Sequence, residues 1–224
     1  LDVIDNTIND NGKGDDEGDE GGEGDSYAGA YVNYVYNNST TTFRGNTISD
    51  NSGQGVYICS EGECSSSALT FENNTIENNN RSGIEVYDVR SSTLEIIGNT
   101  IRENNQDYNE NEGEYTDYPG VYINKVSDGS AVTLRDNVIS DQVMSRGVYI
   151  CGDSGCSSSV FTFEGNTIEN NNSTGIYVGY LNASTFDVLE NTIRNTAGPG
   201  FELGYVGGGE GDGFTPLLPA RWPT

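Results

Sequence analysis

The sequence predicts an all-β solenoid, in which short strands stack in parallel along one axis. The phrase Asn-Thr-Ile-Glu-Asn-Asn-Asn occurs at residues 74–80 and again at 166–172. Shorter versions, Asn-Thr-Ile or Asn-Val-Ile, begin at Asn6, Asn46, Asn99, Asn137 and Asn191. Apolar and polar residues alternate between these triplets, which is the period of a β-strand. No segment shows the spacing of an amphipathic helix.

The triplets define a short repeated unit. Successive triplets lie 25 to 40 residues apart, and three units form a larger repeat of 92 residues. Each unit also has a glycine that opens a short strand: Gly29, Gly55, Gly83, Gly120, Gly147, Gly175 and Gly200. A unit of this size cannot bury its own apolar face, so stacked units must share one core. We expect about seven to eight coils, three per larger repeat.

Parallel stacking places equivalent residues of successive coils above one another, about 4.8 Å apart. The triplet asparagines should then form a ladder of amide hydrogen bonds. The triplet isoleucines should form an aliphatic ladder inside the solenoid: Ile8, Ile48, Ile76, Ile101, Ile139, Ile168 and Ile193.

The seven triplets and the seven Gly-led strands resemble the right-handed parallel β-helix repeat family, the pectate-lyase-like solenoids. The resemblance covers residues 1–206, apart from acidic insertions at residues 11–28 and 104–119. Residues 207–224 have a different character. They are expected to form a Gly-rich linker and a C-terminal tail with several prolines and the only tryptophan.

The composition restricts the partners. The chain has 35 acidic and 10 basic residues, for a net charge of -25. Such a chain repels phosphate backbones, so nucleic-acid binding is not expected. No apolar run is long enough to span a bilayer, so membrane insertion is not expected either.

The four cysteines form two matched pairs, Cys59 with Cys64 and Cys151 with Cys156, each with a C-x4-C spacing. A zinc site would require both pairs to converge, whereas a disulfide requires only that each pair closes a small turn. We therefore predict two disulfides, Cys59–Cys64 and Cys151–Cys156. Disulfides indicate an oxidising compartment, and hence an extracellular or cell-surface location.

No catalytic residues are predicted, and the chain is not expected to be an enzyme. Histidine is absent, which removes the motifs of hydrolases and epimerases in the resembled family. Lyases of this fold need a lysine or arginine base. The arginine pairs Arg44 and Arg135, and Arg102 and Arg194, occupy equivalent repeat positions, which favours a role in the architecture. We recognise no cluster of acidic and basic residues that breaks the repeat.

The first acidic insertion is the one candidate for a bound ion. Its oxygen-rich, Gly-bent composition suits calcium, which takes six to eight oxygen ligands. The candidate ligands are Asp10, Asp15, Asp16, Glu17 and Asp19. A solvated loop without an ion is the other interpretation, and no other cofactor is expected.

Two outer surfaces are expected to be distinctive. The middle residue of the Gly-led strands points outward and forms an aromatic stripe: Tyr31, Tyr57, Tyr122, Tyr149 and Tyr177. The stripe could serve cross-strand packing or contact a sugar or a protein. Runs of serine, such as residues 65–67 and 157–159, form a third face rich in hydroxyl groups. Ordering of water on this face is disfavoured, because the serines lie in turn-like runs.

These observations predict an extracellular structural or adhesive β-solenoid that associates with itself head to tail, as a subunit of a surface filament or stalk. The regular part runs from the Asn-Thr-Ile half of a coil to the Gly200-led half, so the two ends are complementary. Cell-surface glycans are possible further partners. The alternative is a solenoid that binds or degrades polysaccharides, as a lyase does.

Overall fold

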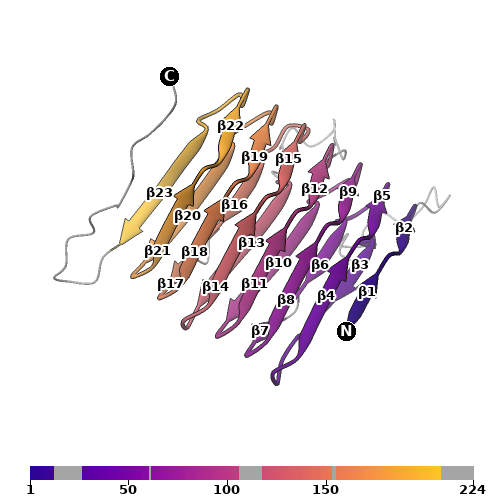
Figure 1. Cartoon of the computed structure of the whole chain (residues 1–224), viewed down its shortest axis with the longest axis horizontal. Coiled ribbons are helices and arrows are strands. Elements are labelled where there is room, and N and C mark those ends of the chain that lie inside the picture. Colours follow the sequence, from indigo (N-terminus) through magenta and orange to yellow (C-terminus); the bar gives the residue numbers. More distant parts are fainter. Residues whose placement is uncertain (13–26, 61, 106–117, 153–154, 208–224) are drawn as a thin grey trace, which may run out of the picture.

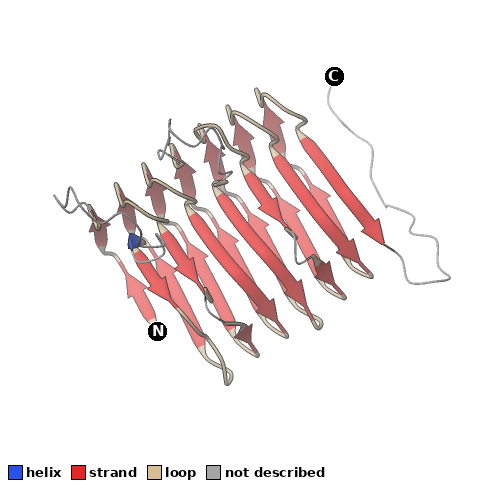
Figure 2. Cartoon of the chain, turned by 180° about the vertical axis from the view of Figure 1, so that it is seen from behind, coloured by secondary structure: helices blue, strands red, loops and turns tan. Residues whose placement is uncertain are grey.

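The computed structural model describes residues 1–12, 27–60, 62–105, 118–152 and 155–207. Their strands stack in parallel along the long axis of a rod (Figure 1), and the N-terminal and C-terminal coils lie at opposite ends. Figure 2 shows the same stack from behind, with loops joining the strands at the corners. No helix among the described residues is long and apolar enough to cross a membrane.

The described strands form three sheets. Sheet A contains β1 (Asp2–Ile4), β4 (Thr40–Arg44), β8 (Ala68–Glu72), β11 (Thr93–Ile97), β14 (Ala131–Arg135), β18 (Val160–Glu164) and β21 (Thr185–Leu189). Sheet B contains β2 (Thr7–Asn9), β5 (Thr47–Ser49), β9 (Thr75–Glu77), β12 (Thr100–Arg102), β15 (Val138–Ser140), β19 (Thr167–Glu169) and β22 (Thr192–Arg194). Sheet C contains β3 (Ala30–Val32), β6 (Val56–Ile58), β7 (Cys64–Ser65), β10 (Ile84–Arg90), β13 (Val121–Ser127), β16 (Val148–Ile150), β17 (Cys156–Ser157), β20 (Ile176–Asn182) and β23 (Phe201–Gly207).

Each coil contributes one strand to sheet A, then one to sheet B, then one or two to sheet C, and coils pair with their neighbours in parallel register. Sheets A and B hold seven strands each, so the chain makes six full turns between β1 and β21. Counted as coils, β1–β3 to β21–β23 make seven, the lower end of the seven to eight coils expected. The first described coil begins with β1 in sheet A, so the expectation that the regular part starts at the Asn-Thr-Ile half was wrong by one strand.

The core consists of columns of identical or similar side chains. The predicted isoleucine ladder is present, because each triplet isoleucine pairs with the next one in sheet B. Its five inner members, from Ile48 to Ile168, are fully buried, whereas Ile8 and Ile193 in the end coils are partly buried. In sheet A, the rings of Phe43 and Phe71 stack with their centroids 5.3 Å apart. The alternation seen in the sequence therefore places one face of every strand in this core.

Glycine opens the sheet C strands because neighbouring coils approach closely at this corner. A Cβ atom added to Gly83 would lie 2.7 Å from Ile101 Cγ2 and 2.8 Å from the carbonyl oxygen of Gly120 in the next coil. The end coil differs, since a Cβ added to Gly200 would meet nothing closer than 3.4 Å.

The predicted asparagine ladder runs along the corner between sheets A and B. Asn74 Nδ2 donates to Asn99 Oδ1 at 2.9 Å, and Asn99 Nδ2 donates to Asn137 Oδ1 at 3.0 Å. The same contact links each of the seven triplet asparagines to the next. Each amide thus satisfies a buried polar neighbour in the adjacent coil, which the corner requires.

A second amide ladder, which we did not foresee, runs along the corner between sheets B and C. It contains Asn11, Asn51, Asn79, Asn104, Gln142 and Asn171. Asn79 Nδ2, for example, donates to Asn104 Oδ1 at 2.9 Å. The glutamine at position 142 keeps the ladder continuous, because its backbone N–H donates to Asn171 Oδ1 at 3.2 Å.

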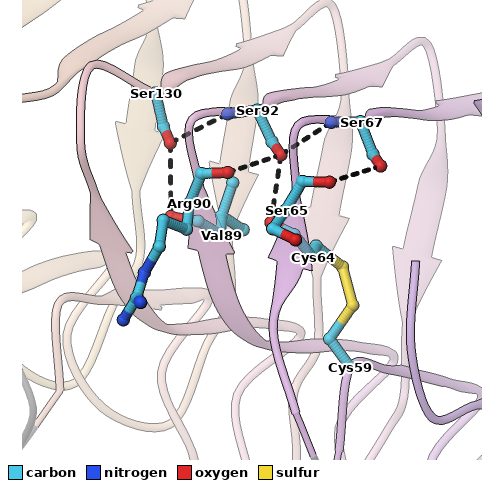
Figure 3. Close-up of a disulfide and its surroundings, with 8 residues drawn as sticks. All are labelled: Cys59, Cys64, Ser65, Ser67, Val89, Arg90, Ser92 and Ser130. Atoms are coloured by element: carbon cyan, nitrogen blue, oxygen red, sulfur yellow. Dashed lines mark hydrogen bonds between the residues drawn. A yellow bond between two sulfur atoms is a disulfide. The ribbon is translucent and has the colours of Figure 1, made fainter. Parts of the chain in front are cut away.

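Serines occupy the third corner, between sheets C and A (Figure 3). The backbone N–H of Ser67 donates to Ser92 Oγ at 3.0 Å, and that of Ser92 donates to Ser130 Oγ at 3.2 Å. Ser159 and Ser184 repeat the arrangement in the next large repeat. All five serines are buried. The interpretation of the serine runs as an outer hydroxyl face was therefore wrong at these positions, because their hydroxyl groups satisfy backbone groups of the corner.

Candidate functional site

The outer face of sheet C differs from coil to coil in the described part of the chain. Strands β10, β13, β20 and β23 cross this face without a break. In the second coil, β6 and β7 are instead separate strands that both pair with β10. The fifth coil is broken in the same way, between β16 and β17.

A disulfide closes each of these breaks. Cys59 bonds Cys64, and Cys151 bonds Cys156, as predicted. Cys59 and Cys151 have φ values of 59° and 56°, so the backbone turns away from the sheet directly after each short strand. All four cysteines are buried in the core. The disulfides thus keep the ends of each loop together where the strand hydrogen bonds are interrupted.

The predicted tyrosine positions are in register on the outer face of sheet C. Tyr31 pairs with Tyr57, and Tyr122, Tyr149 and Tyr177 pair in succession. Their exposure is lower than expected: Tyr31 is 40% exposed, but Tyr57 is only 6% exposed. The rings of Tyr149 and Tyr177 meet at 81°, edge to face, with their centroids 5.0 Å apart. Because each ring covers part of the next, this geometry stabilises the sheet and presents little flat aromatic surface.

Polar residues just before the Gly-led strands pack on this tyrosine column. The Arg146 guanidinium lies 4.9 Å from the ring centroid of Tyr149 and 4.6 Å from that of Tyr177. Glu85 and Glu202 replace tyrosine in the column. Each accepts a hydrogen bond from the residue that precedes the Gly-led strand of the previous coil. Gln54 Nε2 donates to Glu85 at 3.0 Å, and Thr174 Oγ1 donates to Glu202 at 3.1 Å. Both cation–π contacts and hydrogen bonds therefore hold these side chains on the column.

A charged cluster, which we did not predict, lies on the same face beside the first disulfide loop. Asp88 accepts a hydrogen bond from Lys125 Nζ at 3.1 Å. Arg90 pairs with Glu63 at 2.8 Å and approaches Asp128 at 3.5 Å. These five residues break the large repeat, since the positions 92 residues beyond Asp88 and Arg90 hold Tyr180 and Asn182. The cluster could not be recognised from the sequence, because its members come from three coils.

The contacts inside the charged cluster determine its chemistry. Lys125 Nζ lies 3.1 Å from Asp88 and an Arg90 guanidinium nitrogen lies 2.8 Å from Glu63, so each cation is paired with a carboxylate. The cluster contains three carboxylates and two cations, so its net charge is about that of one carboxylate. This arrangement suits fixing the disulfide loop to the sheet better than proton abstraction.

Sheet B carries ion pairs that follow the large repeat. Arg102 pairs with Glu77 at 2.6 Å, and Arg194 pairs with Glu169 in the equivalent position. The hydrogen bond from Arg102 to Glu77 raises the pKa of the Arg102 guanidinium above its usual value. Both arginines are exposed, and a pair that recurs in both large repeats serves the stacking of coils.

The candidate calcium ligands fall mostly outside the described residues. Asp10 is described and exposed, and its carboxylate accepts a hydrogen bond from Asn9. Asp15, Asp16, Glu17 and Asp19 lie outside the described ranges. Within those ranges, no group of three or more acidic or cysteine side chains is placed to hold a metal ion.

Comparison with known families agrees with this geometry. The family model described as "Right handed beta helix region" matches residues 1–110 and 107–210. The chain belongs to the right-handed β-helix family. No curated protein and no solved structure matches the chain significantly. The β-helix family includes both enzymes and non-enzymes, so membership fixes the fold of this chain and leaves its activity open.

Proposed function

We propose that this β-helix is a structural rod at the cell surface or outside the cell, and that copies stack end to end as subunits of a filament or stalk. The observation that carries the proposal is the state of the two end coils. At each end, the described part of every sheet finishes on a parallel strand with one unpaired edge: β1, β2 and β3 at one end, and β21, β22 and β23 at the other. Unpaired edges of this kind are templates for pairing with another chain.

The end coils also leave core positions half covered. Val3, Ile8 and Val32 at one end, and Phe186, Ile193 and Phe201 at the other, pack on the core but are only partly buried. Equivalent positions in the middle coils are fully buried. Stacking the last coil of one copy on the first coil of another would cover these side chains and continue the columns. Burial of apolar area contributes about 25 cal/mol per Å², so the junction gains from each column.

The shapes of the end residues are complementary at the corner where sheet C begins. The innermost column of sheet C runs through Ala30, Val56, Ile84, Val121, Val148, Ile176 and Phe201. Its smallest side chain, Ala30, is at one end and its largest, Phe201, is at the other. A stacked pair of copies would place Phe201 against Ala30, which gives the large ring room that a mid-rod residue would not leave.

The buried disulfides support the extracellular part of the proposal, because structural disulfides persist in oxidising compartments. The ladders support the structural part. They run along all three corners, so a rod that continued them would be stiff along its whole length.

A matched pair of substitutions in β2 tests the stacking. Ile8 points into the core column, whereas Thr7 beside it points outward. Ile8→Asp should place a charge at the junction and abolish assembly, and Thr7→Asp should leave assembly intact. Sedimentation of both variants and of the unaltered chain, with disulfides intact, measures this. If the unaltered chain stays a monomer at high concentration, the proposal is wrong.

A second candidate function, binding or cleavage of a polysaccharide, rests on the charged cluster. The cluster is the one group of acidic and basic side chains found to break the repeat in the described part of the chain, and Tyr87, 42% exposed, belongs to the same strand as Asp88 and Arg90. Lys125→Ala and Arg90→Ala should lower polysaccharide affinity if the cluster binds sugar acids. A panel of neutral and anionic polysaccharides that bind the unaltered chain and both variants equally would remove this candidate.

A further inference from the structure

Sheet A presents a flat outer face. In its five middle strands, β4, β8, β11, β14 and β18 (Figure 1), the first, third and fifth residues point outward, because the second and fourth are buried. The first and third positions hold threonine, alanine or valine, with Glu95 as the exception. Both acidic insertions lie between a sheet B strand and a sheet C strand in the sequence, and both disulfide loops interrupt sheet C. Sheet A therefore offers a surface of mostly small side chains to another molecule.

The other charges of this face lie in one column, at the fifth position of the strands. In successive coils the column reads Arg44, Glu72, Ile97, Arg135 and Glu164. Read in the opposite direction, the column has a glutamate at each arginine position, an arginine at each glutamate position, and Ile97 again in the centre. It is thus complementary in charge to its own reverse. The third positions read the same in both directions, with Glu95 between two pairs of threonines.

The charged side chains of this column are not committed to partners within the chain. Arg44, Glu72 and Glu164 form no ion pair with any described residue. Arg135 Nε only approaches Asp136 Oδ2, at 3.8 Å. The register places a glutamate beside each of these arginines in the next coil. On sheet B, by contrast, both arginine–glutamate neighbours form ion pairs. The sheet A charges are therefore available for contacts with a second molecule.

We propose that the outer face of sheet A binds the same face of a second copy of this chain, so that two rods lie side by side and point in opposite directions. A two-fold axis parallel to the strands and level with β11 relates the two copies. Rotation about this axis reverses the order of the coils and keeps each strand position opposite the same position. Arg44 then meets Glu164 of the second copy, and symmetry repeats the contact. Glu72 meets Arg135 in the same way. This contact uses the side of the rod and does not depend on end-to-end stacking.

The spacing and the reach of the side chains suit this pairing. Coils repeat every 4.8 Å or so, about the same spacing in both copies, so each coil stays opposite its counterpart. Sheets that pack face to face lie about 10 Å apart, a gap that an arginine and a glutamate bridge together. Hydrogen bonds between a guanidinium and a carboxylate are stronger than those between neutral groups. At the third position, threonine meets threonine on both sides of the centre, so no bulky side chain prevents a close approach.

The charge and the area of the face determine the strength of the pairing. The chain has a net charge of -25, which makes copies repel one another. The outward positions of the five middle strands carry only two arginines and three glutamates, so little of that charge lies on this face. Seven coils of five residues cover about 34 Å by 17 Å, roughly 570 Å² per copy, which is less than a standard interface buries. We therefore expect a reversible dimer that forms at high protein concentration.

Sedimentation equilibrium of the full chain carrying Ile8→Asp tests this inference, because that substitution is expected to remove end-to-end stacking. The expected species is a closed dimer, since a two-fold contact uses up the face and cannot grow further. Arg44→Glu alone should raise the dimer dissociation constant at least about tenfold, because like charges then meet at two places. Glu164→Arg alone should have the same effect. Circular dichroism should show that both variants are folded, since neither side chain lies in the core.

A mixture of the two single variants tests the two-fold arrangement itself. One chain with Arg44→Glu and another with Glu164→Arg are complementary at both contacts, so the mixture should form a heterodimer although neither variant dimerises alone. Both substitutions in one chain should restore the homodimer. The matched control combines Arg44→Glu with Glu72→Arg. It keeps the neighbouring coils of one copy complementary but brings like charges together across the axis, so the dimer should be lost.

Glu95 gives a variant that should strengthen the pairing. At the two-fold axis, Glu95 faces Glu95 of the second copy, which is the one like-charge contact among the five middle coils. Glu95→Gln should therefore lower the dissociation constant, as measured by sedimentation in the same Ile8→Asp background. An unchanged or higher dissociation constant would contradict the position of the axis.

The outcomes separate this inference from end-to-end stacking. Loss of the dimer in both single variants, and its recovery in their mixture, support the inference. A monomer at every concentration overturns it and leaves the filament proposal standing. A dimer that survives Arg44→Glu overturns sheet A as the contact face. A mixture that stays monomeric overturns the two-fold arrangement, and so does a dimer of the control that combines Arg44→Glu with Glu72→Arg.

Discussion

At the scale of single residues, the side chains at the corners of the coils make buried hydrogen bonds between neighbouring coils, and the fold depends on them. Asn99 illustrates this, because its amide donates to Phe71 O, Ile97 O and Asn137 Oδ1 and accepts from Asn74. The triplet ladder was predictable, since a fixed phrase surrounds each asparagine. The second ladder was not, because Asn51, Asn79 and Asn104 have different neighbours and Gln142 changes the residue type. Their shared role becomes visible only when the coils are superimposed.

Asn99→Ala should destabilise the fold by about 3 kcal/mol, because it leaves buried backbone and amide groups of the neighbouring coils without partners. Urea unfolding followed by circular dichroism measures the loss. The control is Thr100→Ala, one residue along in β12, whose side chain is not in the core. A loss equal to that of the control would mean that water replaces the ladder at no cost.

The glycines at the start of the sheet C strands give a second test at this scale. Gly83→Ala forces a methyl group against Ile101 and the carbonyl group of Gly120, and should cost about 1–3 kcal/mol as overpacking. Gly200→Ala in the end coil has room, so the stability of a monomer should not change. Stacked copies would place a neighbouring coil against Gly200, so this variant should also weaken assembly. Equal destabilisation of the monomer by both substitutions would contradict the account.

At the scale of elements, sheet C combines uninterrupted strands with two that are broken and closed by disulfides. The C-x4-C spacing was sufficient to predict both bonds. The broken strands themselves were not expected, because the loops that separate β6 from β7 and β16 from β17 leave the strand sequences intact on either side. Nor did the sequence indicate that Arg90, Lys125 and Glu63 meet, since contacts between coils depend on register.

Removing one disulfide, by Cys59→Ser with Cys64→Ser, should lower the free energy of unfolding by about 2 kcal/mol, the chain-entropy value for a loop this small. Removing the second pair should have a similar and additive effect, because the two bonds lie three coils apart. Urea titrations of both double variants and of the quadruple variant measure the sum. Because the cysteines are buried, reductant without denaturant should react slowly, and rapid reduction would contradict this burial.

The first acidic insertion should be dispensable for the solenoid. Deleting residues 12–25 removes no member of the isoleucine ladder, so the sheets should remain intact. Thermal unfolding with added calcium and with a chelator checks this for the deleted and the unaltered chain. Collapse of the deletion variant, or strong stabilisation of the unaltered chain by calcium, would show that an ion held by the insertion supports the fold.

At the scale of the whole molecule, the fold was predictable because seven copies of one phrase impose a single register. The outer surface was harder to predict, because exposure depends on what lies beside each strand. Tyr57 is buried although its position faces outward, and the predicted stripe is mostly edge-to-face packing.

The central claim, that copies continue the β-helix end to end, is tested most directly by electron microscopy of the concentrated, oxidised protein. Seven coils at about 4.8 Å predict a filament with an axial repeat of about 34 Å and an unbroken 4.8 Å spacing across the junctions. Gly200→Ala, examined in parallel, should give folded monomers of the same coil length. If the unaltered protein remains as single short rods at every concentration, the claim is contradicted.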